Sequence, residues 1–353
     1  MQVVGAPGEL YLDSLPLMTV GGSNGAERFG GVVGVGRLSD GGFVVGDGAE
    51  QRLRLYDSDG VLVRTVGGER GDSEEFVQLR WAGVLPGDTL IAFDWRSRKF
   101  SLFTRDGAFV RSFRLERSDI VRLPLPVAVL EDGSVLLDGS AMPAPPTRRV
   151  AAGVYVESTV VARVRTADGS VDSIASYPSR RVYRGDGGSF ATVLPFSPRL
   201  TLASVGDDVI AGFGEDTQVT MFGATGRRTI DVPLPAREIS RAAVEREREK
   251  RMANNSSISP QSGDVGRATP VPAHFPRYDA LVVDDRHRVW VRAYSNGEDA
   301  EHWLIIDRSG VVADRATLPP RFDIVAVAGD HILGRWRDVD DAQYVGVFAL
   351  RRR

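Results

Sequence analysis

One pattern of tight turns recurs along this chain and limits what it can fold into. The turns Asp40-Gly41, Pro86-Gly87 and Asp132-Gly133 follow one another at intervals of 46 residues. A second turn comes 19 residues after the first, at Asp59-Gly60, and 20 residues after the next, at Asp106-Gly107. Two tight turns in each repeat, separated by a longer connection, predict a four-stranded antiparallel meander that recurs along the chain.

Between these turns, short segments alternate apolar and polar residues with the period of two that is typical of half-buried strands. In the second unit the expected strands are Leu79–Leu85, Thr89–Trp95, Phe100–Thr104 and Ala108–Leu115. The first unit has matching segments at Val32–Leu38, Gly42–Gly46, Arg52–Tyr56 and Val61–Val66. We expect the apolar positions of these strands to pack between neighbouring sheets, among them Val44, Leu53, Val61 and Val63.

The pattern gives six units within a single domain, residues 1–353. The units cover residues 32–66, 79–115, 125–177, 199–234, 278–318 and 322–350. The last unit contains only three expected strands, whereas residues 10–20 form one strand without a unit of its own. We expect this N-terminal strand to complete the last sheet and close a ring, because closure hides sheet edges that would otherwise promote aggregation. An open stack of sheets is the alternative.

Two kinds of segment carry a resemblance to a known family. Residues 20–29 and 66–76 are similar to the glycine-rich segment that precedes the first strand of its repeat, and residues 45–60 and 92–103 resemble its second strand, turn and third strand. Over residues 20–115 the sequence therefore resembles the NHL-type six-bladed β-propellers. The resemblance implies an all-β fold of six four-stranded antiparallel blades. It implies no single activity, because this architecture hosts both enzymes and binding proteins.

Strand direction alternates within each expected blade, so the connections divide between the two faces of the ring. The short turns lie on one face, and the long insertions, residues 142–154, 177–198 and 235–276, lie on the other. Loops on a rigid scaffold usually carry binding residues, so we expect function on the insertion-bearing face. In the last insertion, residues 236–255 predict a helix rich in Glu, Arg and Ala. This helix is either a solvated surface helix or a lid over the axial opening.

Composition excludes several classes of protein and site. The absence of cysteine from all 353 residues excludes disulfides, thiolate zinc sites and cysteine nucleophiles. The formal net charge of −3 argues against nucleic acid as a partner bound through bulk charge. No apolar run reaches the roughly 18–20 residues that span a bilayer, so no transmembrane segment is expected. The first residues lack the pattern of a secretory signal, so the compartment stays open: an exported, periplasmic protein would need an upstream leader.

Candidate ligand-binding residues lie at strand ends and loops on the insertion-bearing face. They are Trp95, Arg96 and Arg98 in the second unit, Glu301 and His302 in the fifth, and Trp336, Arg337 and Asp338 in the sixth. A tryptophan beside an arginine is typical of a binding hot spot, although such a pair also serves as a purely structural stack. Oxygen-rich acidic loops would suit Ca²⁺, but no cofactor and no dedicated metal site is predicted.

Two functions of different classes fit this pattern. We favour a non-catalytic binding platform that recognises a protein, a peptide or a polar small ligand on the insertion-bearing face. The alternative is a hydrolase or lyase that uses a metal ion or an acid–base pair over the axial opening, with candidates His302, Glu301, Asp338 or His274. The platform is favoured because no isolated set of carboxylates and histidines recurs at matching strand ends.

Overall fold

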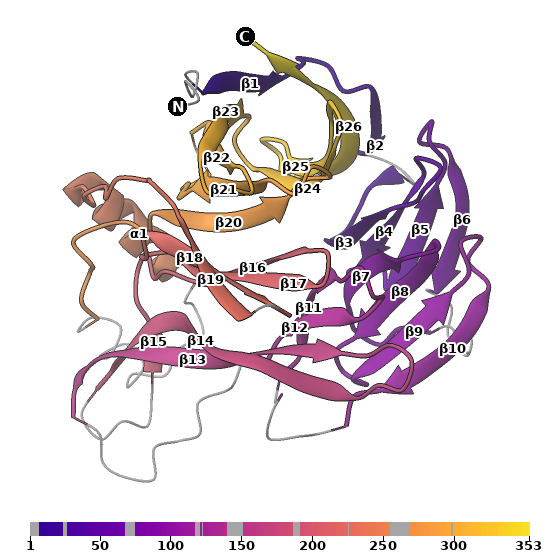
Figure 1. The fold of residues 1–353 in the computed structure, drawn as a ribbon, viewed down its shortest axis with the longest axis horizontal. Coiled ribbons are helices and arrows are strands. Elements are labelled where there is room, and N and C mark those ends of the chain that lie inside the picture. The colour runs from indigo at the N-terminus through magenta and orange to yellow at the C-terminus, as the bar shows by residue number, and fades with distance from the viewer. Residues whose placement is uncertain are drawn as a thin grey trace.

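The computed structural model describes residues 7–23, 27–67, 75–116, 121, 123–139, 151–185, 191–224, 226–254, 269–297 and 299–353. In these residues, short antiparallel sheets follow one another around a ring, and the two ends of the chain come together at one sheet (Figure 1). Within each meander, strands that follow one another in the sequence are hydrogen-bonded to one another, as the recurring turns predict. Gly41, Gly87 and Gly133 in those turns have φ values of 94°, 78° and 77°, a left-handed conformation that favours glycine.

Four of the sheets stand alone and have four or five strands each. The first contains β3 (Val32–Arg37), β4 (Phe43–Asp47), β5 (Arg52–Tyr56) and β6 (Leu62–Gly67). The second contains β7 (Leu79–Leu85), β8 (Thr89–Asp94), β9 (Lys99–Phe103) and β10 (Phe109–Arg114). The third contains β11 (Leu125–Val129), β12 (Val135–Asp138), β13 (Gly153–Val164), β14 (Val171–Arg184) and β15 (Ala191–Val193). The fourth contains β16 (Leu200–Val205), β17 (Asp208–Phe213), β18 (Gln218–Gly223) and β19 (Gly226–Asp231).

The remaining sheet has nine strands, because the N-terminal segment joins two meanders. One meander contains β20 (Tyr278–Val283), β21 (Val289–Ala293), β22 (Glu301–Ile306) and β23 (Val312–Leu318). The other contains β24 (Phe322–Ala328), β25 (His331–Arg337) and β26 (Gln343–Arg352). The N-terminal strands are β1 (Gly8–Leu12) and β2 (Met18–Gly21).

The N-terminal segment pairs with the last meander, as expected, but as two strands and not one. β1 lies parallel to β23 on one side and antiparallel to β26 on the other, where Leu12 faces Leu350. β2 is also antiparallel to β26, and Val20 faces Val345. Pro16 lies between the two strands, and a proline cannot donate a hydrogen bond to a neighbouring strand.

Contacts between the first strands of successive meanders close the ring. β3 contacts β7, β7 contacts β11, β11 contacts β16, β16 contacts β20, β20 contacts β24, and β24 contacts β3. Two of these junctions use the same link: Gln51 Oε1 accepts the N–H of Leu79 at 2.6 Å, and Gln343 Oε1 accepts that of Val32 at 2.8 Å. The same kind of glutamine-to-backbone hydrogen bond therefore joins the last meander to the first and the first to the second.

Apolar side chains fill the spaces between neighbouring sheets. Leu53 of β5 and Leu79 of β7 belong to one buried cluster, and Val44 is fully buried in it, as expected. The prediction for Val61 and Val63 is wrong, because these side chains are 60% and 65% exposed. They lie on and beside β6, the outermost strand of its sheet, and the described part of the structure leaves them uncovered.

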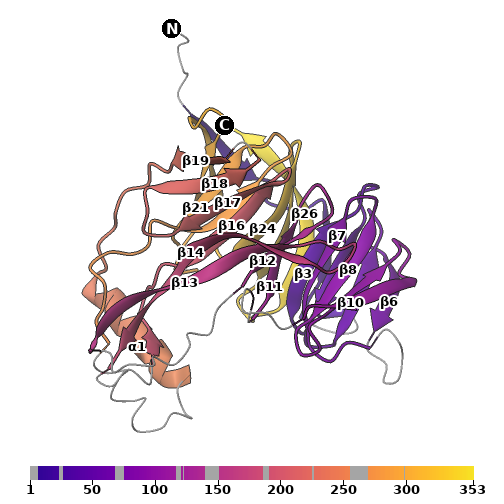
Figure 2. The same cartoon turned by 60° about the horizontal axis from the view of Figure 1, so that its bottom comes forward.

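The third sheet departs most from the expected strand lengths. We expected a connection over residues 177–198, but β14 continues to Arg184 and β15 follows it. The strands lengthen because β13 and β14 keep pairing out to Gly153 and Arg184. Figure 2 shows this long hairpin extending away from the ring. Most of the other insertion of this sheet, residues 140–150, lies outside the described residues.

The long insertion after β19 contains the helix of the described structure, α1 (Arg241–Asn254). The sequence predicted a longer helix, over residues 236–255. Helix α1 begins later because Ser240 caps it: the Ser240 Oγ accepts the N–H of Ala243 at 3.2 Å. Residues 255–268 of the insertion lie outside the described part. Arg251 holds α1 against β15 by donating to the carbonyl of Val193 at 3.0 Å. No helix in the described ranges is long and apolar enough to cross a membrane.

Candidate functional site

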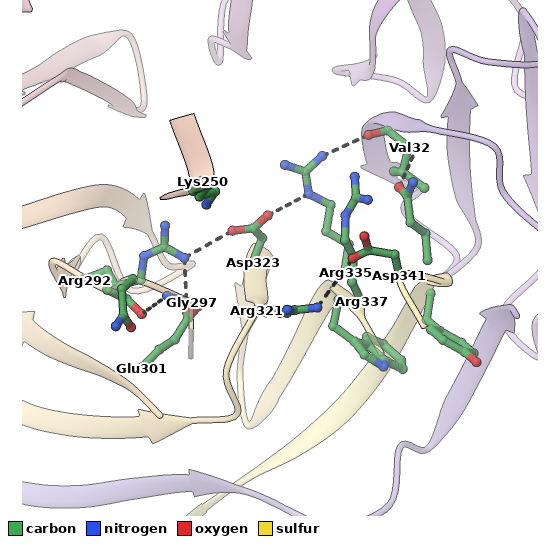
Figure 3. A pocket seen from close by; sticks show the side chains of 15 residues that line it. Val32, Lys250, Arg292, Gly297, Glu301, Arg321, Asp323, Arg335, Arg337 and Asp341 are labelled. Carbon is green, nitrogen blue, oxygen red and sulfur yellow. Dashed lines mark hydrogen bonds and ion pairs between the residues drawn. The ribbon is translucent and has the colours of Figure 1, made fainter. Parts of the chain in front are cut away.

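A cavity of about 620 Å³ lies on the face that carries the insertions. Strands β3, β21, β22 and β24–β26 contribute to its walls, together with the loops after β21 and β25. Helix α1 contributes Lys250 from the opposite side (Figure 3). Its charged lining residues are Lys250, Arg292, Glu301, Arg321, Asp323, Arg335, Arg337 and Asp341. The volume falls in the range of small-molecule sites, and five of these eight groups are cationic.

One arginine in the cavity wall is shared by three carboxylates. Arg292 Nε donates to Asp279 Oδ1 at 2.7 Å. Its Nη1 donates to Glu301 Oε2 at 3.1 Å and to Asp323 Oδ1 at 3.2 Å. These groups come from β20, β21, β22 and β24, so the cluster joins two meanders. Figure 3 shows Arg292 with Glu301 and Asp323. A single guanidinium carries one positive charge, so it cannot neutralise all three acids at once.

Burial raises the pKa of two of these acids, Glu301 and Asp279. Glu301 is 2% exposed, and this burial raises its pKa to about 7. The positive charge of Arg292 lowers the pKa, whereas the negative charges of Asp323 and Asp279 raise it. Burial also raises the pKa of Asp279, against the effect of Arg292. The cavity wall therefore holds a carboxyl group that exchanges its proton near neutral pH, as general acids and bases and pH-responsive binding sites do.

The polar network continues from this cluster to the first sheet. Arg335 Nε donates to Asp323 Oδ2 at 3.1 Å, and its Nη1 donates to the carbonyl of Val32 at 3.3 Å. Gln343 binds the N–H of the same Val32 (Figure 3). The cavity thus lies at a junction where three meanders meet, and its wall is held by hydrogen bonds between them.

The outer part of the cavity carries cations with few acidic partners. Within the described residues, the side chains of Arg337 and Lys250 have no hydrogen bond or ion pair, and both residues are exposed. Arg321 Nη1 lies 3.5 Å from Asp341 Oδ1, a weak exposed pair. These groups are free to bind an anion without breaking a strong internal bond.

An aromatic stack supports the end of β25, where Arg337 lies. The Trp336 ring stacks on Tyr344, with centroids 5.3 Å apart, and on Phe322, with centroids 6.1 Å apart. The Tyr344 hydroxyl donates to Asp338 Oδ2 at 3.0 Å. Partial burial raises the pKa of Asp338. The hydrogen bond from Tyr344 and those from the N–H groups of Ala342 and Asp340 outweigh this effect and lower the pKa. Asp338 is therefore an ionised loop anchor.

Comparisons with known proteins bear on the fold. No family model and no curated protein matches this chain. Among solved structures, it is similar to a member of the DUF4221 family from Bacteroides vulgatus, with 8% identity, a TM-score of 0.61 and coverage of 99% of this chain and 100% of that one. The chain has a β-propeller fold.

Two further solved structures are similar to this chain over almost its whole length. One is a gluconolactonase from Xanthomonas campestris, with 12% identity, a TM-score of 0.48 and coverage of 99% of each chain. The other is the WD40 repeats of RRP9, with 9% identity, a TM-score of 0.49 and coverage of 98% and 99%. At this level of similarity, neither structure indicates an activity for this chain.

The propeller brings three of the predicted site residues into one cavity. Glu301, Trp336 and Arg337 all line the cavity described above. His302 alternates to the other side of β22, where it is exposed and lines a neighbouring cavity. His274 lies in the insertion after β19, where its backbone pairs with that of Glu238.

The predicted residues of the second blade lie elsewhere. Trp95 packs against the apolar cluster between the second and third blades. Arg98 donates to the carbonyls of Leu115 and Glu116, each at 3.2 Å, and so ties the loop between these blades. Arg96 is exposed, and none of the three lines the cavity with Arg337.

Sequence reasoning missed the inner half of the site. Asp279 and Arg292 occur inside apolar strands, Tyr278–Val283 and Val289–Ala293, and a charged residue in such a strand is a signal that could have found them. Lys250 carried no signal of its own, because it is one of many charged residues on the predicted helix.

The described residues contain no group of three or more His, Asp or Glu side chains placed to hold a metal ion. The acidic cluster around Arg292 is already bonded to that guanidinium. Acidic loops would suit Ca²⁺, but no Ca²⁺ site was predicted from the sequence.

Proposed function

We propose that this protein is a binding propeller that holds a negatively charged polar small ligand in the cavity next to Arg337. The proposal includes a single-domain ring of six blades of the NHL type, with residues 235–276 inserted as a helix-containing segment. The six first-strand contacts, which return from β24 to β3, support the count. The repeated glutamine link at the β3–β7 and β26–β3 junctions supports closure.

The observation that carries the proposal is the charge of the cavity. Five cations line it, and two of them, Arg337 and Lys250, have no partner within the described part of the chain. Arginine and lysine at a concave polar site bind carboxylate and phosphate groups. The concave shape and the volume of about 620 Å³ favour a small molecule over a protein or peptide. Glu301, Trp336 and Arg337 are the predicted residues that would contact it.

Titration with inorganic phosphate at low ionic strength tests this proposal. We expect saturable binding by calorimetry, which weakens as salt is added because exposed charges are screened. Arg337→Ala should weaken binding by about tenfold, since it removes a charge-assisted hydrogen bond. Arg114→Ala is the matched control, because Arg114 is an exposed arginine on β10, outside the cavity. Absence of phosphate binding, or equal binding by Arg337→Ala, would overturn the proposal.

A second function, acid–base catalysis in the same cavity, is supported by Glu301. Its carboxyl group lines the cavity, is nearly fully buried and has its pKa raised to about 7 by that burial. A group with such a pKa suits proton transfer at neutral pH. Conversion of a bound ligand by the wild type, lost in Glu301→Gln while binding remains, would establish the enzyme. Unchanged ligand recovered from both proteins would leave the binding function alone.

A further inference from the structure

A second cavity adjoins the one next to Arg337. It has a volume of about 1270 Å³ and shares Lys250, Ser295 and Asn296 with the first. One face of α1 forms its outer wall, through residues at helical spacing: Ala243, Arg246, Glu247 and Lys250. A molecule that extends past Lys250 therefore passes from the first cavity into the second without leaving the protein surface.

The inner wall of this second cavity is aromatic, in contrast to the charged first cavity. Tyr294 stacks on Phe275 with ring centroids 5.3 Å apart and an interplanar angle of 21°. Phe196 meets Phe275 edge to face at 5.0 Å. The Arg237 guanidinium lies 5.5 Å from the centroid of the Phe275 ring. All four side chains line the cavity, which is also lined by charged residues of α1.

The aromatic wall is fixed by the backbone of the blade and the insertion. The N–H of Tyr294 donates to the carbonyl of Arg277 at 3.0 Å, and the N–H of Phe275 donates to that of Arg237 at 2.9 Å. Tyr294 is half-buried, and within the described residues its hydroxyl has no hydrogen-bond partner. Tyr294 lines the second cavity, so this hydroxyl is accessible to a bound molecule.

We propose that the ligand is an elongated organic anion: a phosphate or carboxylate held by Arg337 and Lys250, joined to an aromatic group that lies against Tyr294 beneath α1. This rests on the proposed function and names its ligand class. An inorganic anion occupies only the charged cavity, whereas an aryl phosphate bound beside Lys250, which lines both cavities, also places its ring in the second. Stacking on an aromatic side chain adds binding free energy beyond that of the charged end.

The experiment compares inorganic phosphate with phenyl phosphate and 1-naphthyl phosphate on the full chain, by calorimetry at one ionic strength. In the wild type we expect the aryl phosphates to bind roughly three- to tenfold more tightly than inorganic phosphate. Tyr294→Ala should remove this gain and leave the affinity for inorganic phosphate unchanged. Tyr294→Phe keeps the ring and should retain most of the gain, and Lys250→Met should weaken all three probes.

The outcomes separate this inference from the proposed function. If inorganic phosphate fails to bind the wild type, the proposed function fails. If it binds, but the aryl phosphates bind no more tightly, or Tyr294→Ala keeps their advantage, the anion site stands and the elongated ligand is refuted. Thermal unfolding of each variant checks that the blade is intact; should Tyr294→Ala unfold, Tyr294→Leu replaces it, with the same expected loss.

Discussion

The first two blades and the last two blades both bury carboxylates on the same face of the ring, but satisfy them differently. Asp47, at the end of β4, is fully buried and accepts N–H groups of Gly30, Gly31, Ala49 and Glu50 at 3.0–3.2 Å. Each oxygen bonds to loop backbone, and the buried Arg54 guanidinium lies 3.5 Å from Oδ2 as an additional partner. These backbone donors cannot leave without unfolding the loops, so this carboxylate is structural.

In the last two blades, the buried carboxylate of Glu301 has a side chain as its donor, Arg292, which also serves Asp279 and Asp323. Arg292 divides its one positive charge among three acids, of which only Asp323 has a second cationic partner within the described residues, Arg335. A buried acid is therefore a candidate for function when its donor is a shared side chain that lines a cavity. Burial alone does not distinguish the two cases.

The largest expected effect comes from the second blade. Asp94 accepts the N–H groups of Val77, Gln78 and Ser97 at 2.6–2.8 Å. Despite its burial, the hydrogen bonds from Gln78, Ser97 and Val77 lower its pKa. Asp94→Ala leaves these donors unsatisfied, and we expect the free energy of unfolding to fall by about 3 kcal/mol or more. Urea denaturation measures it.

Asp106→Ala is the control for this experiment, because Asp106 lies in an exposed turn. It should change the free energy of unfolding by less than about 0.5 kcal/mol. Anion binding by folded Asp94→Ala should equal that of the wild type. Weakened binding in this variant would break the comparison, since it would place the first blades in the functional site.

The next effect concerns pH and Glu301. Its pKa is about 7 in the folded protein against an ordinary value of 4.5, so its protonated form contributes stability that is complete below pH 4.5 and is lost as the pH rises through 7. The full difference amounts to roughly 3 kcal/mol. Arg292, Asp279 and Asp323 face Glu301 from β21, β20 and β24, and they remain in Glu301→Gln.

We therefore expect urea denaturation between pH 5 and pH 8 to show a smaller loss of stability in Glu301→Gln than in the wild type. The difference between the two proteins isolates Glu301, because the other titrating groups are common to both. Parallel curves would mean that Glu301 ionises at its ordinary pH, and its contrast with Asp47 would then rest on geometry alone.

The ring was predictable from the sequence, because tight turns and the alternation of apolar and polar residues are local signals that recur in each repeat. Gly41, Gly87 and Gly133 mark the same turn three times. The site was only partly predictable, since it arises where three blades meet and no local pattern encodes that junction. Arg337 was found because it follows a tryptophan at a strand end, whereas Arg292 and Lys250 converge on it from β21 and α1.

The smallest expected effect on stability compares two similar pairs, Trp95-Arg96 and Trp336-Arg337. Both arginines are exposed, so Arg96→Ala and Arg337→Ala should each change the free energy of unfolding by less than about 0.5 kcal/mol. They should differ in phosphate binding, because only Arg337 lines the cavity. Calorimetry on both variants measures this. Equal weakening would show that the ligand also reaches the second blade, and the division between structural and functional blades would no longer hold.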